Sequence, residues 1–227
     1  IPGPPGTQSR PDLAEGGPMA RSARDLELLL KVIAGPRPAE ERSWALNMAP
    51  SVVHRLDQAR VGFWLEDPLC PVEQELTEGY QALGKSLAER GALVTEAKHP
   101  LLNLEHILPA YFNLLGTLLS TSLKPAQRRQ MKWIARLEPW LKFLGPMTPF
   151  IGEYGRGVNQ PVYQWMAWSE MREKMRAEIE SLFQEVDVLL TPVTPTTAIR
   201  HDHTHPVFKR RITVAGHPRA YMDQFCW

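Results

Sequence analysis

The stretch RVGFWLEDPLCPVEQELTEGYQALGKSLAERGALVTEA, residues 60–97, decides the fold class. Its opening segment, 60–66, is an apolar run typical of a strand. Apolar side chains at helical spacing then predict a helix over 72–90, and the run 92–97 predicts a second strand. A strand, a helix and a strand in this order form a βαβ unit, in which the two strands are parallel. We therefore predict an α/β protein.

Toward the N-terminus, the sequence predicts a helix over 21–34, which follows a loop rich in proline and glycine. Ser22 can cap this helix, and Asp25 completes the capping pattern three residues later. Gly35 and the proline after it end the helix. The apolar positions of the helix fall on one face: Leu26, Leu29, Leu30 and Ile33. A face of this kind requires a packing partner.

The centre of the chain, at about 104–145, is predicted to be an insertion of short helices. It is expected to break at its prolines: Pro109, Pro125, Pro139 and Pro146. The helix predicted over 127–144 carries arginines and a lysine beside apolar stripes. A membrane-surface or partner-binding helix has this composition. A solvated basic face over a packed apolar face explains the same residues, and we favour that interpretation.

A long helix is predicted over 162–184, with these side chains facing inward: Trp165, Trp168, Met171, Met175, Ile179, Leu182 and Phe183. The run after it, Val186–Leu190, is typical of a strand buried on both faces. The segment 191–195 leaves the carboxyl end of that strand, where open parallel sheets bind ligands. We interpret this segment either as the rim of a pocket or as a simple strand exit.

Composition and charge restrict the class of protein. The 227 residues are 43% apolar, which is enough for a sizeable core, and 26 basic against 25 acidic residues leave a net charge of +1. A nearly neutral chain has no bulk electrostatic attraction for nucleic acid. The uncharged run 107–123 contains too many polar residues to span a bilayer. We expect Cys70 and Cys226 to be free thiols in a cytoplasmic protein without a cofactor.

Histidines at alternate positions give the clearest signal of chemistry. His201, His203 and His205 would share one side of an extended segment and could ligate zinc or nickel. No cysteine or carboxylate at a known spacing for further ligands accompanies them, so we expect solvated histidines and no metal site. The sequence also lacks the common motifs of a serine nucleophile or a phosphate-binding loop. From the residues alone, no catalytic group can be assigned.

Three stretches carry a family resemblance: GPMARSARDLELLLKVIAGP at 17–36, VDVLLTPVTP at 186–195 and AGHPRAYMDQFCW at 215–227. In this order they resemble the amidase signature family of serine hydrolases. The resemblance implies a mixed, largely parallel sheet covered by helices. It also implies hydrolysis of a carboxamide to a carboxylate and ammonia or an amine, through a serine acyl-enzyme.

In that family the nucleophilic serine, a second serine and a lysine base lie in or before a segment rich in glycine and serine. Residues 1–227 contain no such segment. The resemblance therefore implies that the chain is part of a single amidase domain, truncated at both ends, and that it holds no catalytic residue. We expect the isolated chain to be inactive.

Two other functions remain open. A glutaminase subunit of a tRNA-dependent amidotransferase would share the fold, although Lys209–Ile212 only partly matches the basic loop expected of such a subunit. The second alternative is not an enzyme. It is a non-catalytic fragment that binds a ligand through its histidines.

The candidate substrate-binding residues are Asp223, Tyr111 and Phe112. Asp223 matches an aspartate that faces the substrate in some glutamine-using relatives, although it could instead cap the helix after it. Tyr111 and Phe112 lie in the uncharged run and could line an acyl-binding tunnel or simply be buried in a helix. The expected partner is a small-molecule amide, with no nucleic acid or membrane, and a homodimer is compatible with the sequence.

Overall fold

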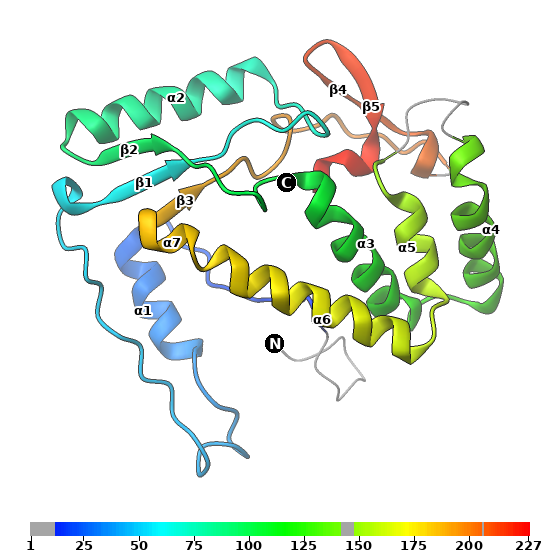
Figure 1. Ribbon diagram of the computed structural model, residues 1–227, viewed down its shortest axis with the longest axis horizontal. Coiled ribbons are helices and arrows are strands. Elements are labelled where there is room, and N and C mark those ends of the chain that lie inside the picture. The colour runs from blue at the N-terminus through cyan, green and yellow to red at the C-terminus, as the bar shows by residue number, and fades with distance from the viewer. Residues whose placement is uncertain (1–11, 142–147, 206) are drawn as a thin grey trace. The chain divides into compact units, whose positions relative to one another are not determined.

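A computed structural model describes residues 12–141, 148–205 and 207–227. The chain forms two compact units, one up to His54 and one from Arg55 to Trp227. The second unit contains a parallel sheet, a group of helices and a C-terminal hairpin (Figure 1). The predicted α/β class is confirmed. Within the described ranges, no helix is long and apolar enough to cross a membrane.

Helix α1, Ala23–Ile33, lies in the first unit and begins at the predicted cap. The Ser22 hydroxyl accepts a hydrogen bond from the Asp25 N–H at 3.1 Å. The helix ends at Ala34, and Gly35 then adopts a φ of +146°. The predicted apolar face is exposed, with Leu26 37%, Leu29 39%, Leu30 41% and Ile33 56% accessible to solvent.

Three parallel strands form the sheet of the second unit, in the order β2-β1-β3. They are β1, Arg60–Phe63, β2, Leu93–Glu96, and β3, Val188–Leu190. Val61 of β1 lies in register with Val94 of β2 and Val188 of β3. Helix α2, Gln74–Glu89, joins β1 to β2, so the predicted βαβ unit is confirmed.

Strand β3 is less buried than the sequence predicts. Val186, just before the strand, is 4% exposed, whereas Val188 inside it is 46% exposed. The prediction of a strand buried on both faces is therefore wrong for β3. In the described sheet β3 is an edge strand, with a neighbouring strand on one side only.

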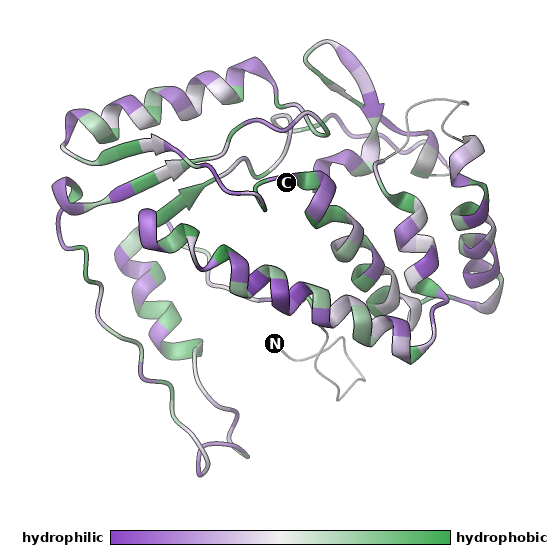
Figure 2. Ribbon diagram, in the orientation of Figure 1, coloured by the Kyte–Doolittle hydropathy of each residue, from purple (hydrophilic) through white to green (hydrophobic). Residues whose placement is uncertain are grey.

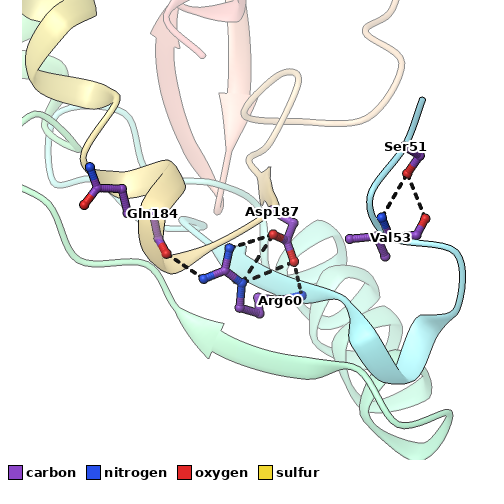
Figure 3. Close-up of polar contacts among 5 residues, drawn as sticks. All are labelled: Ser51, Val53, Arg60, Gln184 and Asp187. Atoms are coloured by element: carbon purple, nitrogen blue, oxygen red, sulfur yellow. Dashed lines mark hydrogen bonds and ion pairs between the residues drawn. The ribbon is translucent and has the colours of Figure 1, made fainter. Parts of the chain in front are cut away.

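An ion pair joins β1 to the residue that precedes β3 (Figure 3). The Arg60 backbone N–H donates to Asp187 Oδ2 at 2.8 Å, and Arg60 Nη2 lies 2.7 Å from Asp187 Oδ1. The Arg60 guanidinium also donates to the Gln184 carbonyl oxygen. These hydrogen bonds from Arg60 lower the pKa of Asp187 below its usual value. The pair fixes the point at which β3 enters the sheet.

The helical region contains α3, Leu104–Ser120, α4, Pro125–Leu141, α5, Ile151–Val158, and α6, Val162–Ile179. Helix α3 is coloured mainly as hydrophobic and α4 mainly as hydrophilic (Figure 2). Helix α5 contacts both α3 and α4 and lies between them (Figure 1). Helix α3 also contacts α6.

The predicted break occurs at Pro125, where α4 begins after the end of α3, but Pro109 and Pro139 do not break their helices. Pro109 lies inside α3 and Pro139 inside α4, whereas Pro125 is the first residue of α4. A proline in the first turn loses nothing, because the N–H that it lacks has no acceptor within the helix there. A proline further along removes one backbone hydrogen bond, which the packing of α3 against α5 and α6 outweighs. Pro146 lies outside the described residues.

Helix α6 is shorter and more exposed than predicted. It ends at Ile179, and a separate short helix, α7, follows at Leu182–Glu185. Every residue of α6 is at least partly exposed, and Met171 is 46% exposed. Leu182 is buried as predicted, but Phe183 is exposed. Four of the residues predicted to face inward are half-buried: Trp165, Trp168, Met175 and Ile179. Ile179 packs against a cluster of buried residues.

Glycines allow α5 to pack closely against α3. Gly116 of α3 lies against the Tyr154 carbonyl group, and Gly157 of α5 lies against the Asn113 carbonyl group. The Thr117 hydroxyl donates to the Gly157 carbonyl oxygen at 3.0 Å. A side chain at either glycine would overlap these backbone atoms, so the close approach of the helices depends on glycine at both positions.

The sequence analysis does not predict the C-terminal hairpin. Strand β4, Arg211–Val214, pairs antiparallel with β5, His217–Ala220, and a 3-10 helix, η4, follows at Tyr221–Phe225. Ala215 and Gly216 form the turn with φ values of +50° and +78°. Positive φ at both positions suits a two-residue hairpin turn, but Ala-Gly is not one of the dipeptides by which such turns are recognised.

We expect Gly116→Ala to destabilise the protein, because the new methyl group would overlap the Tyr154 carbonyl oxygen. Overpacking of this kind costs about 1–3 kcal/mol. The matched control is Gly79→Ala in α2, where nothing lies within 4 Å of the added carbon. That change should stabilise the helix by about 0.5–1 kcal/mol. Denaturant unfolding measures both variants, and effects of the same sign would contradict the packing described.

We expect Asp187→Asn to lower the melting temperature at neutral pH, because Arg60 loses its carboxylate partner. The pKa of Asp187 is depressed in the folded state. The stabilisation is therefore complete above the unfolded pKa, about 4, and is lost as the pH falls through the lower folded value. The difference in melting temperature between wild type and variant should shrink from about pH 5 downward. A difference that does not depend on pH would argue against the ion pair.

Candidate active site

A turn at residues 67–70, here called the Asp67 turn, lies between β1 and α2 and is hydrogen-bonded to the start of α3. Asp67 is 5% exposed. Its carboxylate accepts two backbone hydrogen bonds. Its Oδ1 accepts from the Leu69 N–H at 2.8 Å, and its Oδ2 accepts from the Leu104 N–H at 2.9 Å. Leu104 is the first residue of α3. A carboxylate at this place satisfies a free N–H and interacts favourably with the helix dipole.

The C-terminal segment is bound to the carbonyl oxygens of the same turn. Arg219 Nη2 donates to the Leu69 carbonyl oxygen at 2.8 Å, and Trp227 Nε1 donates to the Cys70 carbonyl oxygen at 2.9 Å. The Trp227 ring also meets the Trp64 ring edge to face, with centroids 5.0 Å apart. These contacts hold η4, and with it Asp223, against the turn.

Asp223 is a buried acid with one oxygen bound and one oxygen unpaired. Its residue is 2% exposed, and Oδ2 accepts from Arg219 Nε at 2.8 Å. In the described part of the chain, Oδ1 has no hydrogen-bond partner. Burial raises the pKa of Asp223, and the Arg219 charge and the Thr148 hydroxyl oppose that rise. An unpaired acceptor at this depth is costly unless a ligand or another group donates to it.

Apolar side chains of α3 pack in a hydrophobic cluster with Cys70 and Cys226, which are hydrogen-bonded to the Asp223 carbonyl oxygen. We name the whole group the Asp223 cluster; its members are Trp64, Cys70, Tyr111, Phe112, Arg219, Asp223, Cys226 and Trp227. Phe112 is 2% exposed, and Tyr111 is half-buried beside it with the ring centroids 5.3 Å apart. Burial raises the pKa of Tyr111. Tyr111 and Phe112 thus belong to one hydrophobic cluster, and Asp223 is joined to that cluster by the hydrogen bond from Cys70, while the roles of all three residues stay predictions.

The two cysteines meet inside the cluster and are free thiols. Cys70 Sγ donates to the Asp223 carbonyl oxygen at 3.8 Å, and the Cys226 N–H donates to the same oxygen at 3.1 Å. A hydrogen bond between the thiols lowers the pKa of Cys70 and raises that of Cys226. Sequence reasoning treats these cysteines only as a clue to redox compartment, because nothing local shows that they meet.

A cavity of about 520 Å³ lies between α2 and the carboxyl ends of β1 and β2, and Trp64 of the Asp223 cluster forms part of its lining. Its lining includes Tyr80 and Lys85 of α2 and Glu96 of β2. The segment 191–195 does not contribute to this lining. Instead, the Pro195 carbonyl oxygen accepts from the Glu73 N–H at 2.8 Å, at the start of α2. The strand exit is therefore packed against the helix.

One serine and histidine pair occurs but is not arranged as a nucleophile and base. His99 Nε2 lies 3.1 Å from Ser181 Oγ, and His99 Nδ1 accepts from the Leu101 N–H. Because Nδ1 is the acceptor, the neutral ring carries its proton on Nε2 and donates to the serine. Ser181 in turn donates to the Glu178 carbonyl oxygen. The imidazole cannot take a proton from Ser181 in this arrangement.

The alternating histidines lie on an exposed segment. The rings of His201 and His203 have centroids 6.3 Å apart, and both residues are exposed. In the ranges that the structure covers, no three histidine, cysteine, aspartate or glutamate side chains lie close enough together to hold a metal ion.

Curated relatives cover nearly the same span of this chain. The A subunit of glutamyl-tRNA(Gln) amidotransferase from Mycobacteroides abscessus is 30% identical over 211 residues, which are 83% of this chain and 42% of the relative. The protein of the same name from Thermus thermophilus is 30% identical over 208 residues, covering 80% and 41% of the two chains. The chain thus spans about two-fifths of the length of these relatives.

Solved amidase structures share the fold. A bacterial aryl acylamidase of the amidase signature family superimposes with a TM-score of 0.57 at 17% identity, covering 93% of this chain and 42% of that one. A structure described as an amidase gives 0.54 at 20% identity, with 92% and 41% covered. The amidase family profile matches residues 2–219. On that match, which takes in almost every residue of the sequence, the chain belongs to the amidase signature family.

Proposed function

We propose that this protein is part of an enzyme that hydrolyses carboxamides to a carboxylate and ammonia or an amine. Family membership supports this class of reaction. The location of the proposed substrate-binding site rests on Asp223. Arg219 holds one oxygen of the buried carboxylate, and the other has no hydrogen bond of good geometry among the described residues, although the Thr148 hydroxyl is near enough to lower the pKa of the acid. Such an oxygen can accept a hydrogen bond from a substrate N–H and orient the amide for attack.

In the proposed reaction a serine attacks the amide carbonyl, and the C–N bond breaks as the leaving nitrogen is protonated. Water then releases the carboxylate from the acyl-enzyme. Backbone N–H groups would stabilise the oxyanion. We propose that the serine and its lysine base lie outside residues 1–227, so that this chain contributes substrate recognition. Residues 1–227 alone should not hydrolyse an aryl amide, and turnover blocked by a serine-directed phosphonate would contradict this.

The names of the curated relatives favour a second candidate, the glutaminase subunit of a tRNA-dependent amidotransferase. Such a subunit would hydrolyse glutamine and pass the ammonia to a partner. The partial match of Lys209–Ile212 to the expected basic loop counts against it. Substrate preference separates the candidates, because a glutaminase subunit should prefer glutamine to a simple amide. The small-molecule partner, the homodimer and the cytoplasmic location stay predictions.

Asp223→Asn tests the assignment in the intact protein that contains this chain. The change keeps the size of the side chain and removes its charge. A hydrogen bond to a charged group contributes about 1.5–3 kcal/mol, so kcat/KM should fall about 10- to 100-fold. For an enzyme that binds the substrate ammonium, the loss should be larger with glutamine than with butyramide. The control is Asp57→Asn, whose side chain is 45% exposed. If kcat/KM of the Asp223→Asn variant is unchanged, Asp223 does not bind the substrate.

The tunnel assignment of Tyr111 and Phe112 has a separate test. Because Phe112 is 2% exposed, Phe112→Ala is expected to lower stability strongly, by about 3–5 kcal/mol. Tyr111 is half-buried, so Tyr111→Ala is the more selective variant. If Tyr111 lines a tunnel, the ratio of kcat/KM for hexanamide and acetamide should change, since each buried methylene contributes about 0.8 kcal/mol. If Tyr111→Ala lowers the melting temperature but leaves the ratio of kcat/KM for hexanamide and acetamide unchanged, Tyr111 and Phe112 are core residues and do not line a tunnel.

A further inference from the structure

Helix α4 presents apolar and basic side chains together on its solvent side. Trp133 is 61%, Leu137 43% and Trp140 73% exposed. At 3.6 residues per turn these positions share one side of the helix, and the tryptophans are about 10 Å apart along its axis. Arg129 and Arg136 fall on the same side. We call these five residues the outer face of α4. From the sequence we favour an apolar face of this helix that packs against the protein. That interpretation is wrong for Trp133, Leu137 and Trp140, which are exposed.

The opposite side of α4 makes the contacts that hold the helix in place. Ala135 is 8% exposed and lies against Gly155 of α5. The Glu138 side chain is 8% exposed and forms an ion pair with Arg156 of α5 at 3.6 Å. Since Glu138 is the acidic residue of α4, its negative charge lies on the packed side. The contacts described between α4 and α5 therefore come from the side opposite the outer face.

The charge of the solvent side is entirely positive. The exposed basic residues are Arg128, Arg129, Lys132 and Arg136, and among the described residues none of them takes part in an ion pair. A helix that lies on an anionic bilayer combines such a basic surface with tryptophan and leucine. Tryptophan rings prefer the level of the lipid head groups, and arginine side chains can extend from there to the phosphates.

We propose that the outer face of α4 docks on an anionic membrane surface, with the helix axis parallel to that surface. The shape of the face favours lipid over a protein partner. The tryptophans stand on the convex ridge of a single helix, which a deformable bilayer can surround, whereas tryptophans at protein interfaces fill packed pockets. The positive charge complements anionic head groups. This proposal departs from the expectation of no membrane contact and does not depend on the proposed reaction.

The test measures how the intact protein binds vesicles of phosphatidylcholine with and without phosphatidylglycerol. Wild type should bind the anionic vesicles, and added salt should weaken the binding. Arg129→Gln with Arg136→Gln should weaken it about 30-fold, because each basic residue near the surface contributes about 1 kcal/mol, or about fivefold. Trp133→Ser with Trp140→Ser should weaken it at least about tenfold. Trp44→Ser, at a tryptophan that is 46% exposed, is the control and should bind as wild type does.

Circular dichroism and the melting temperature show whether the variants fold. If the double tryptophan variant does not fold, the double arginine variant alone decides the question. Absence of wild-type binding to anionic vesicles at low salt would overturn the proposal. So would binding that survives both double variants. Binding to polyglutamate without binding to vesicles would assign the face to an acidic protein, and self-association that the tryptophan pair abolishes, again without vesicle binding, would assign it to a second copy. Either result would also overturn the proposal.

Discussion

The carboxylate of Asp67 is the interaction on which the second unit depends. It accepts hydrogen bonds from the Leu69 and Leu104 N–H groups and thereby fixes both the turn after β1 and the start of α3. The carbonyl oxygens of that turn then bind Arg219 and Trp227 of the C-terminal segment. Sheet, helix and C-terminus meet at this buried group, so removing its charge would disturb all of them.

This junction also fixes the position of Asp223. Arg219 donates both to the Leu69 carbonyl oxygen and to Asp223 Oδ2, so the position of the acid is tied to the Asp67 turn. The second oxygen of Asp223 is buried without a described donor. Leaving such a group unpaired costs about 1–3 kcal/mol, so a donor from a ligand would be favourable there. An amide or ammonium group of a substrate would satisfy it.

Local patterns predict much of the fold and little of the site. The βαβ unit and the Ser22 cap follow from periodicity and capping, which act over a few residues. The Ala215-Gly216 turn has no recognisable signal, and the exposure of Val188 depends on which elements surround the edge of the sheet. Resemblance to a family, not periodicity, points to Asp223. Its neighbour Cys70 could not be inferred, because tertiary packing alone brings the Asp67 turn to the C-terminus, whereas its partner Arg219 lies only four residues before Asp223 in the sequence.

We propose that Asp223 Oδ1 accepts a hydrogen bond from the substrate. An experimental structure of the intact protein with a slowly hydrolysed amide bound would test this. We expect a nitrogen of the ligand within about 3 Å of Asp223 Oδ1, in ordinary hydrogen-bond geometry, with Arg219 still bound to Oδ2. A ligand bound elsewhere, with Oδ1 occupied by a donor from the protein itself such as the Thr148 hydroxyl, would contradict it.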